Sequence, residues 1–215
     1  MAGVDTVIHA AALKRVEVGE YNPGEMVKTN VLGTMNVIDA AIDARVRKVV
    51  AISSDKACQP LNTYGASKLM MEKLIIGAQN TRGRDGPVYS VCRYGNVAGS
   101  TGSVIPTWRA AMQERRESIW ITAPAATRFW MTVDQAVELV LGAAETCPGG
   151  NLHVPDLPAY RLGDLARAMD LPMTLRITGL TLGEKLHERM LEDGPDSSQV
   201  RRMTIDELRE GLAKL

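Results

Sequence analysis

The chain lacks the features that mark membrane, secreted and nucleic-acid-binding proteins. No apolar run approaches the roughly 20 residues that a membrane-spanning helix needs, and no basic stretch followed by an apolar core stands near the start. Lys plus Arg and Asp plus Glu number 25 each, so no overall basic field attracts nucleic acid or an anionic membrane surface. We therefore expect a cytoplasmic protein that binds a small molecule, with no nucleic-acid or membrane partner.

Cysteine and histidine are also scarce. The three cysteines are an odd number with no C-x-x-C spacing, which indicates neither a disulfide framework nor a zinc knuckle. The three histidines lie too far apart in the sequence to form a local metal-binding motif. These residues are Cys58, Cys92, Cys147, His9, His153 and His187. We expect no metal site.

Length and hydrophobic pattern indicate the fold class. A chain of 215 residues with 45% apolar residues can form one domain, or one domain with a small appended lobe. Short β-branched runs predict strands at 4–9, 48–53 and 88–93, and apolar periodicity predicts helices at 24–45 and 63–80. Strands that alternate with helices favour a doubly wound parallel α/β sheet.

The alternation changes beyond residue 103, which indicates a smaller lobe woven into the carboxyl edge of the sheet. The elements predicted there are a helix at 104–115, strands at 119–121 and 129–131, a helix at 133–146, a strand at 152–154, a helix at 162–169 and a last helical pair. No linker is long enough to separate independent domains.

One short segment carries most of the readable chemistry. Tyr64 and Lys68 are about one helical turn apart, so their side chains share a helix face, and a cation there favours phenolate over phenol. Asp55 and Lys56 follow the predicted strand 48–53, at the strand end where α/β sheets collect their catalytic groups. The segment predicts proton transfer on a sugar or alcohol.

Nine motifs, in order, resemble the extended short-chain dehydrogenase/reductases, and within them the inverting UDP-N-acetylglucosamine 4,6-dehydratases of the polysaccharide-biosynthesis group. They include His9-Ala10-Ala11-Ala12-Leu13-Lys14, Lys28-Thr29-Asn30, Ser53-Ser54-Asp55-Lys56-Ala57, Tyr64-Gly65-Ala66-Ser67-Lys68, Arg93-Tyr94-Gly95-Asn96-Val97, Gly102-Ser103-Val104-Ile105-Pro106, Thr127-Arg128-Phe129-Trp130 and Gly183-Glu184-Lys185-Leu186-His187-Glu188. The Asp-Lys pair is the most specific, because related sugar-nucleotide dehydratases usually carry Asp-Glu there and epimerases carry neither.

The resemblance implies a reaction and a role for each catalytic residue. The sugar is oxidised at carbon 4 with NADP (NAD is possible), loses water across carbons 5 and 6, and is reduced at carbon 6. Tyr64 takes the proton of the 4-hydroxyl and Lys68 lowers the pKa of Tyr64 while holding the nicotinamide ribose. Lys56, with a pKa lowered by burial or by Lys68, takes the carbon-5 proton, and Asp55 protonates the departing 6-hydroxyl.

The resemblance also implies two sets of binding residues and a division of the chain. The cofactor set is Ala10, Ala11, Ala12, Asn30, Ser53, Tyr64, Lys68 and Tyr94, and the set for the UDP-sugar is Lys14, Ser54, Asn96, Ser103, Arg128 and Glu184. Residues 1–103 would form a partial Rossmann-like region with the catalytic residues, and residues 104–215 mainly a C-terminal substrate-binding lobe.

The chain departs from the family pattern at three places, one of which is Ala125-Ala126 before Thr127-Arg128. The family opens with a Gly-rich cofactor loop, but no G-x-x-G-x-x-G motif occurs here, and the first predicted strand resembles the family's fourth. We expect an exposed apolar edge at residues 4–8 and, from it, a homo-oligomer. Thr181-Leu182 stands where the family commonly has Arg-Pro, which weakens the case for tight binding of uridine diphosphate.

Two other functions remain open from the sequence. A sugar-nucleotide epimerase would share Tyr64 and Lys68, but it would not need Asp55 and Lys56 as an acid and base pair. An inactive remnant would serve only as a binding or assembly partner, which the missing cofactor loop favours and the intact catalytic set disfavours.

Overall fold

The computed structural model describes residues 1–146, 149–171, 174–181 and 183–215, so Cys147 and Leu182 lie outside the described residues. The chain forms two compact units. The first comprises Met1–Tyr94 and Asp134–Pro155, and the second comprises Gly95–Val133 and Asp156–Leu215. Where the sequence predicted one boundary near residue 103, the structure has a discontinuous division, because a helix and a strand from the later half pack into the first unit.

The first unit is built on a parallel sheet with strand order β1-β2-β3-β6. The strands are β1 (Thr6–His9), β2 (Lys48–Ile52), β3 (Val88–Cys92) and β6 (Asn151–His153). Strand β1 pairs only with β2 among the described strands, and Ile8 is 45% exposed. The predicted open edge is therefore present at β1.

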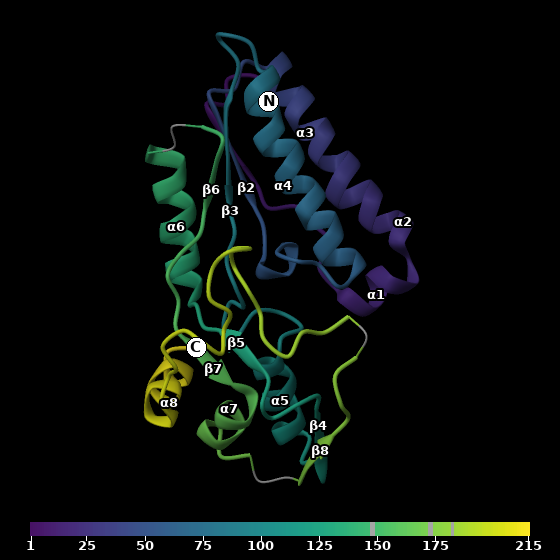
Figure 1. Cartoon of the computed structure of the whole chain (residues 1–215), viewed down its shortest axis with the longest axis vertical. Coiled ribbons are helices and arrows are strands. Elements are labelled where there is room, and N and C mark those ends of the chain that lie inside the picture. The colour runs from purple at the N-terminus through teal and green to yellow at the C-terminus, as the bar shows by residue number, and fades with distance from the viewer. Residues whose placement is uncertain (147–148, 172–173, 182) are drawn as a thin grey trace. The chain divides into compact units, whose positions relative to one another are not determined.

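Helices cover both faces of this sheet, as the alternation of side chains along β2 requires. Val49 and Ala51 join the apolar cluster of α3 (Gly33–Asp43) and α4 (Thr63–Thr81). Val50 packs on the opposite face, with Val140 and Ala143 of α6 (Val133–Thr146). Figure 1 shows α3 and α4 on one side of the strands and α6 on the other. The predicted doubly wound α/β fold is confirmed.

The helix predicted at 24–45 is interrupted. After α1 (Val16–Tyr21), the short helix α2 (Pro23–Met26) runs into a π-helical turn, η1 (Val27–Leu32), before α3 begins. Pro23 at the start of α2 lacks only an N–H that a first helical turn does not use. The π turn carries Asn30, which is buried, and such turns often mark functional positions.

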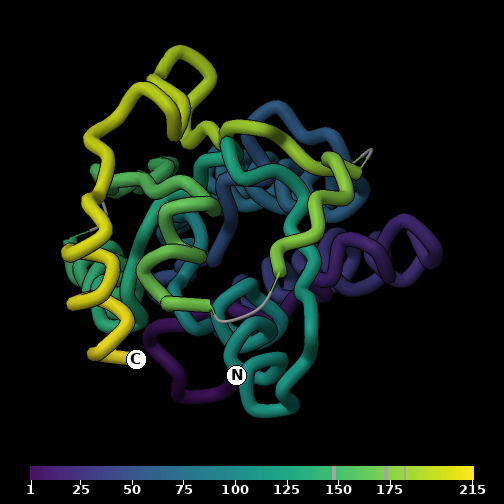
Figure 2. Tube along the Cα trace, turned by 90° about the horizontal axis from the view of Figure 1, so that it is seen from below, coloured from purple at the N-terminus to yellow at the C-terminus, as the bar shows by residue number. Residues whose placement is uncertain are grey.

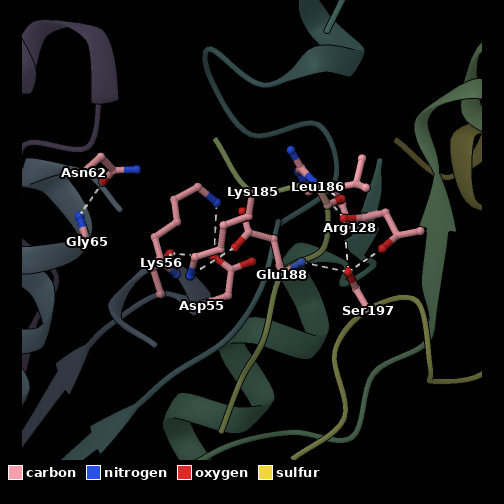
Figure 3. A network of polar contacts seen from close by, with 11 residues as sticks. Asp55, Lys56, Asn62, Gly65, Arg128, Lys185, Leu186, Glu188 and Ser197 are labelled. Carbon is pink, nitrogen blue, oxygen red and sulfur yellow. Dashed lines mark hydrogen bonds and ion pairs between the residues drawn. The ribbon is translucent and has the colours of Figure 1, made fainter. Parts of the chain in front are cut away.

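Helix α4 approaches the end of β2 unusually closely. A 3₁₀ turn, η2 (Asp55–Ala57), follows β2, and a Cβ atom at Gly65 would lie 2.2 Å from the carbonyl oxygen of Lys56. Asn62 caps α4, because its Oδ1 accepts a hydrogen bond from the Gly65 amide at 2.7 Å (Figure 3). Only glycine permits this contact between the helix and the turn.

The second unit combines two small sheets with three helices among its described residues. Its elements are α5 (Val104–Gln113), β4 (Ser118–Ile121), β5 (Thr127–Phe129), β7 (Ala159–Arg161), α7 (Leu162–Ala168), β8 (Thr174–Ile177) and α8 (Ile205–Ala213). Strand β4 pairs parallel with β8, and β5 pairs antiparallel with β7. The core of the second unit contains aromatic side chains among aliphatic ones. The rings of Trp130 and Tyr160 meet there edge to face, with centroids 5.6 Å apart.

The predicted last helical pair is wrong, because the described residues between β8 and α8 contain no helix. Figure 2 shows this C-terminal segment, in yellow-green to yellow, extended along the second unit before it winds into α8. Helix α8 begins at a capping box in which Thr204 and Glu207 each satisfy the other's backbone amide. None of the described helices is long and apolar enough to cross a bilayer.

We predict opposite stability changes for two glycines of α4. Gly65→Ala should lower the free energy of unfolding by about 1–3 kcal/mol, because the new methyl group collides with the Lys56 carbonyl. The matched control, Gly77→Ala, meets no atom within 4 Å and should raise stability by about 0.5–1 kcal/mol. Urea unfolding of both variants tests this, and equal stabilities would show that α4 does not need the close approach.

Candidate active site

The carboxyl end of β2 holds the predicted acid and base pair. Backbone bonds extend the strand, because the Ser53 amide donates to the Cys92 carbonyl at 2.7 Å and the Asp55 amide to the Tyr94 carbonyl at 3.0 Å. The Ser54 hydroxyl then caps η2 by accepting from the Lys56 amide at 3.3 Å. This local geometry fixes Asp55 and Lys56 at the strand end.

Asp55 is a nearly fully buried carboxyl group with one oxygen in use. It is 1% exposed, and its Oδ1 accepts from the Ser54 hydroxyl at 2.9 Å and from Lys56 Nζ at 3.1 Å (Figure 3). Its Oδ2 is buried and has no hydrogen-bond partner among the described residues. A buried oxygen of this kind requires a proton or a ligand group, since an unsatisfied buried acceptor is costly.

Tyr64 and Lys68 lie on one face of α4, as predicted, and both are buried. Burial raises the pKa of Tyr64, while the charge of Lys56 and a hydrogen bond with Ser54 act to lower it and the charge of Asp55 raises it. The predicted lowering of the Tyr64 pKa by Lys68 is therefore wrong for the chain without a ligand. Lys56 is the cation that opposes the effect of burial.

Lys68 is held in place by a hydrogen bond to the end of β2. Its ammonium group donates to the carbonyl of Ile52, the last residue of β2, and lies 3.3 Å from Met71 Sδ. Burial lowers the pKa of Lys68 to about 8, and the charge of Glu72 acts in the opposite direction. Glu72 itself forms a two-pronged buried ion pair with Arg93 on the sheet, with contacts of 2.9 and 2.6 Å.

The residues predicted for a cofactor lie around the same strand ends. Ala10 and Ala11 are exposed and Ala12 is half-buried in the segment after β1, so their small side chains leave the backbone accessible. Asn30 secures this segment, because its amide donates to the Leu13 carbonyl at 2.9 Å and accepts from the Leu13 amide at 2.8 Å. The structure thus gives Asn30 a positioning role, and a direct cofactor contact stays a prediction.

Two further predicted cofactor residues fit a polar ligand. The Ser53 hydroxyl is buried without a hydrogen-bond partner among the described residues. Burial raises the pKa of the Tyr94 phenol to about 12, with smaller effects from Cys92 and Tyr64, so Tyr94 is a neutral hydrogen-bonding group at pH 7. Together with the open alanine segment, these groups suit a nucleotide cofactor.

The second unit contains a cavity of about 220 Å³ that gathers four of the six predicted substrate residues, Asn96, Ser103, Arg128 and Glu184. Asn96 Oδ1 and Ser103 Oγ are buried and lack partners among the described residues. Lys14 and Ser54, the other two, belong to the first unit, where Lys14 is exposed and Ser54 contacts Asp55. The aromatic lining from Trp108, Trp120, Trp130 and Tyr160 was not predicted.

A buried polar network beside this cavity also escaped prediction. Thr127 Oγ1 lies 2.8 Å from His187 Nδ1 and 2.6 Å from Ser197 Oγ, and the Glu188 amide donates to Ser197 Oγ at 2.9 Å. Arg128, next along β5, donates to the Thr127 and Leu186 carbonyls at 2.8 and 3.3 Å (Figure 3). Up to 70 residues separate these partners, so no local sequence signal joins them.

Comparison with known proteins finds a matching family model and similar relatives over most of the chain. The family model described as polysaccharide biosynthesis protein matches residues 1–208. A UDP-N-acetylglucosamine 4,6-dehydratase (inverting) of Campylobacter jejuni is 44% identical over 191 residues, and a UDP-glucose 4-epimerase of Rickettsia massiliae is 43% identical over 195. Each alignment covers 89% of this chain but 57% of the relative, so the chain spans less than two thirds of their length.

A solved structure extends the likeness to the fold. The X-ray structure of Pen from Bacillus thuringiensis is 35% identical, superimposes with a TM-score of 0.91, and covers all of this chain and 77% of that one. The TM-score agrees with a Rossmann-like fold of the short-chain dehydrogenase/reductase type.

The depressed pKa of Lys68 predicts a specific dependence of stability on pH. Lys68 has a pKa of about 8 in the folded chain, against about 10.5 unfolded, so between these values the unfolded state binds more protons. The stability of the wild type relative to Lys68→Met should be lowest below pH 8 and rise by on the order of 3 kcal/mol towards pH 10.5. Urea unfolding of both proteins from pH 7 to pH 10 measures this difference. A constant difference would show that Lys68 keeps its ordinary pKa.

Proposed function

The chain belongs to the polysaccharide biosynthesis protein family, and we propose that it carries the chemistry of a nucleotide-sugar 4,6-dehydratase that acts on UDP-N-acetylglucosamine. The observation that carries this proposal is the buried Asp55 carboxyl group, paired to Lys56 at 3.1 Å and placed against Tyr64. Water loss needs an acid and a base beside the residue that deprotonates the sugar hydroxyl, and this cluster supplies all three.

The first step assigned to the chain is removal of the proton from the 4-hydroxyl of the sugar by Tyr64. A phenolate is required, and burial opposes it, so the positive charge of Lys56 and a hydrogen bond with the Ser54 hydroxyl help Tyr64 to ionise. Lys68 would hold the ribose of the cofactor. A bound nicotinamide supplies the oxidising and later the reducing equivalent for the ring.

The second step is elimination across carbons 5 and 6. The carbonyl formed at carbon 4 acidifies the proton on carbon 5. Lys56 passes its own proton to Asp55, 3.1 Å away, and then removes the carbon-5 proton as the neutral amine. The electron pair of that C–H bond forms the double bond to carbon 6, and the carbon–oxygen bond at carbon 6 breaks. Asp55 Oδ2, the buried oxygen without a partner among the described residues, donates the proton that converts the leaving hydroxyl into water.

We assign the cofactor to the first unit and the nucleotide to the cavity of the second. NADP is the proposed cofactor, with NAD as the other candidate, held by Ala10, Ala11, Ala12, Ser53, Tyr64, Lys68 and Tyr94. Asn96, Ser103, Arg128 and Glu184 line a cavity whose polar atoms suit the UDP part of the substrate. Lys14 and Ser54, in the first unit, stay predicted substrate residues. A charge-assisted hydrogen bond from Arg128 to phosphate would be the strongest of these contacts.

Two further properties form part of this proposal. We propose that the enzyme acts in the cytoplasm. It self-associates as a homo-oligomer, because the outer edge of β1 is unpaired within the described chain and Ile8 is exposed there.

Epimerisation is the second candidate function, because relatives named UDP-glucose 4-epimerase are as similar as 43%. An epimerase needs Tyr64 and Lys68 for oxidation at carbon 4, but it eliminates no water. Asp55 and Lys56 would then be dispensable for its chemistry, which separates the two functions experimentally.

We predict that the chain with UDP-N-acetylglucosamine and NADP in heavy water yields a product that has lost one water and gained deuterium at carbon 5, where the removed proton is replaced from solvent. Lys56→Met and Asp55→Asn should each lower this conversion by about 10²–10⁴-fold, because each removes one proton-transfer group. Lys73→Met, which removes an exposed lysine of α4, is the matched control and should leave it unchanged. Mass spectrometry of the nucleotide sugar measures all four proteins, and NAD is run in parallel.

Two results would contradict the dehydratase. A product of unchanged mass with inverted carbon 4, formed equally by Lys56→Met, would establish an epimerase. No conversion by the folded wild type with either cofactor would show that this chain is an inactive or incomplete form.

A further inference from the structure

Arg176 lies over the ring of Trp120, a residue that lines the cavity of the second unit. They lie directly opposite each other in the parallel register of β4 and β8, which run side by side in Figure 1. The guanidinium carbon of Arg176 lies 5.6 Å from the centroid of the Trp120 ring. This distance is within the range of a cation–π contact, which holds the planar guanidinium against the indole.

The hydrogen-bond donors of Arg176 are available. The residue is exposed, and no hydrogen bond or ion pair joins it to any described residue. Arg201 and Arg209 of the same unit, by contrast, are engaged: Arg201 pairs with Glu207 at 2.8 Å, and Arg209 pairs with Asp170 and Asp206 at 3.2 Å. Stacking uses only the face of a guanidinium, so its five N–H groups still point outwards in its plane.

Trp120 connects this cation to the cavity. It lines the cavity, yet it is 62% exposed, which is unusual for the largest apolar side chain. Its strand neighbours Ile119 and Ile121 are buried in the core, so the position on β4 is fixed. Arg176 is thus held against Trp120 of β4, whose side chain lines the cavity.

Among the described residues that line the cavity, Arg128 is the one cation. Thr181 is uncharged, and its amide donates to Oε2 of the cavity residue Glu184 at 3.1 Å. Arg128 lines the cavity, but its Nη1 donates to two backbone carbonyls. A diphosphate carries more negative charge than this one partly occupied guanidinium can neutralise.

We propose that Arg176, held in place by Trp120, binds the diphosphate of a nucleoside diphosphate ligand in this cavity. The inference rests on the proposed function, because it assumes a nucleotide in the cavity. It assigns a phosphate-binding residue that no motif in the sequence indicates. Trp120 acts as a positioning residue, since it orients Arg176 and need not touch the phosphates.

Calorimetric titration of the full chain with UDP and with uridine tests the assignment, because the two ligands differ only in the diphosphate. Arg176→Gln should weaken UDP binding by about ten- to a hundredfold, the range of a lost charge-assisted hydrogen bond, and leave uridine binding unchanged. Arg167→Gln, at an exposed arginine of α7, is the matched control and should alter neither. The double variant Arg176→Gln with Thr181→Arg should regain most of the lost affinity for UDP.

Trp120→Leu provides a second readout. It should weaken UDP binding in the wild-type background and have a smaller effect when Arg176 is already glutamine, because the two side chains act together. Circular dichroism and urea unfolding confirm that each variant is folded.

The possible failures are distinguishable. Unchanged UDP affinity in Arg176→Gln, or equal loss for UDP and uridine, overturns the role of Arg176 and leaves the proposed function standing. A folded wild type that binds neither ligand overturns both the inference and the proposal that this cavity takes the nucleotide.

Discussion

The contact between α4 and the turn after β2 is the constraint on which the candidate active site depends. Gly65 brings the helix against the Lys56 carbonyl, and Asn62 fixes the point at which the helix begins. Because the turn and the helix share this contact, the pair Asp55 and Lys56 and the pair Tyr64 and Lys68 are placed by one packing event. A displacement of either element by one ångström would separate the acid and base from the phenol.

The same arrangement stores unfavourable energy in the core of the first unit. Lys68 is 4% exposed with a pKa of about 8, and Asp55 keeps one buried oxygen without a described partner. Neighbouring groups offset the cost of burying Lys68 only in part. Its ammonium group donates to the carbonyl at the end of β2, but the nearby Glu72 carboxylate already forms an ion pair with Arg93. Buried polar groups that a stable fold would avoid are typical of sites under selection for chemistry.

The sequence predicts the parts of this structure that depend on local patterns. β-branched runs located β2 and β3, and the four-residue spacing placed Tyr64 and Lys68 on one helix face. Prediction from the sequence failed for features that depend on contacts between residues far apart in the chain. Asn30, in the π turn, forms hydrogen bonds with Leu13 and Ser67, which are far from it in the sequence. The residues that line the cavity range from 96 to 184. The Tyr64 pKa depends on burial, which the spacing of residues does not reveal. The capping box at Thr204, in contrast, is a sequence signal that marks the start of the last helix, α8.

The discontinuous division of the chain also constrains how it folds. The first unit is incomplete until residues 134–155 have been made, since α6 must cover the second face of the sheet, and the second unit needs residues up to α8. During synthesis, neither unit can therefore finish before most of the chain has left the ribosome. Parallel strands such as β3 and β6, nearly 60 residues apart, close large loops before their contacts form, which slows folding and lengthens the time that apolar strand edges stay exposed. We therefore expect the interleaved topology to increase the need of the nascent chain for chaperones.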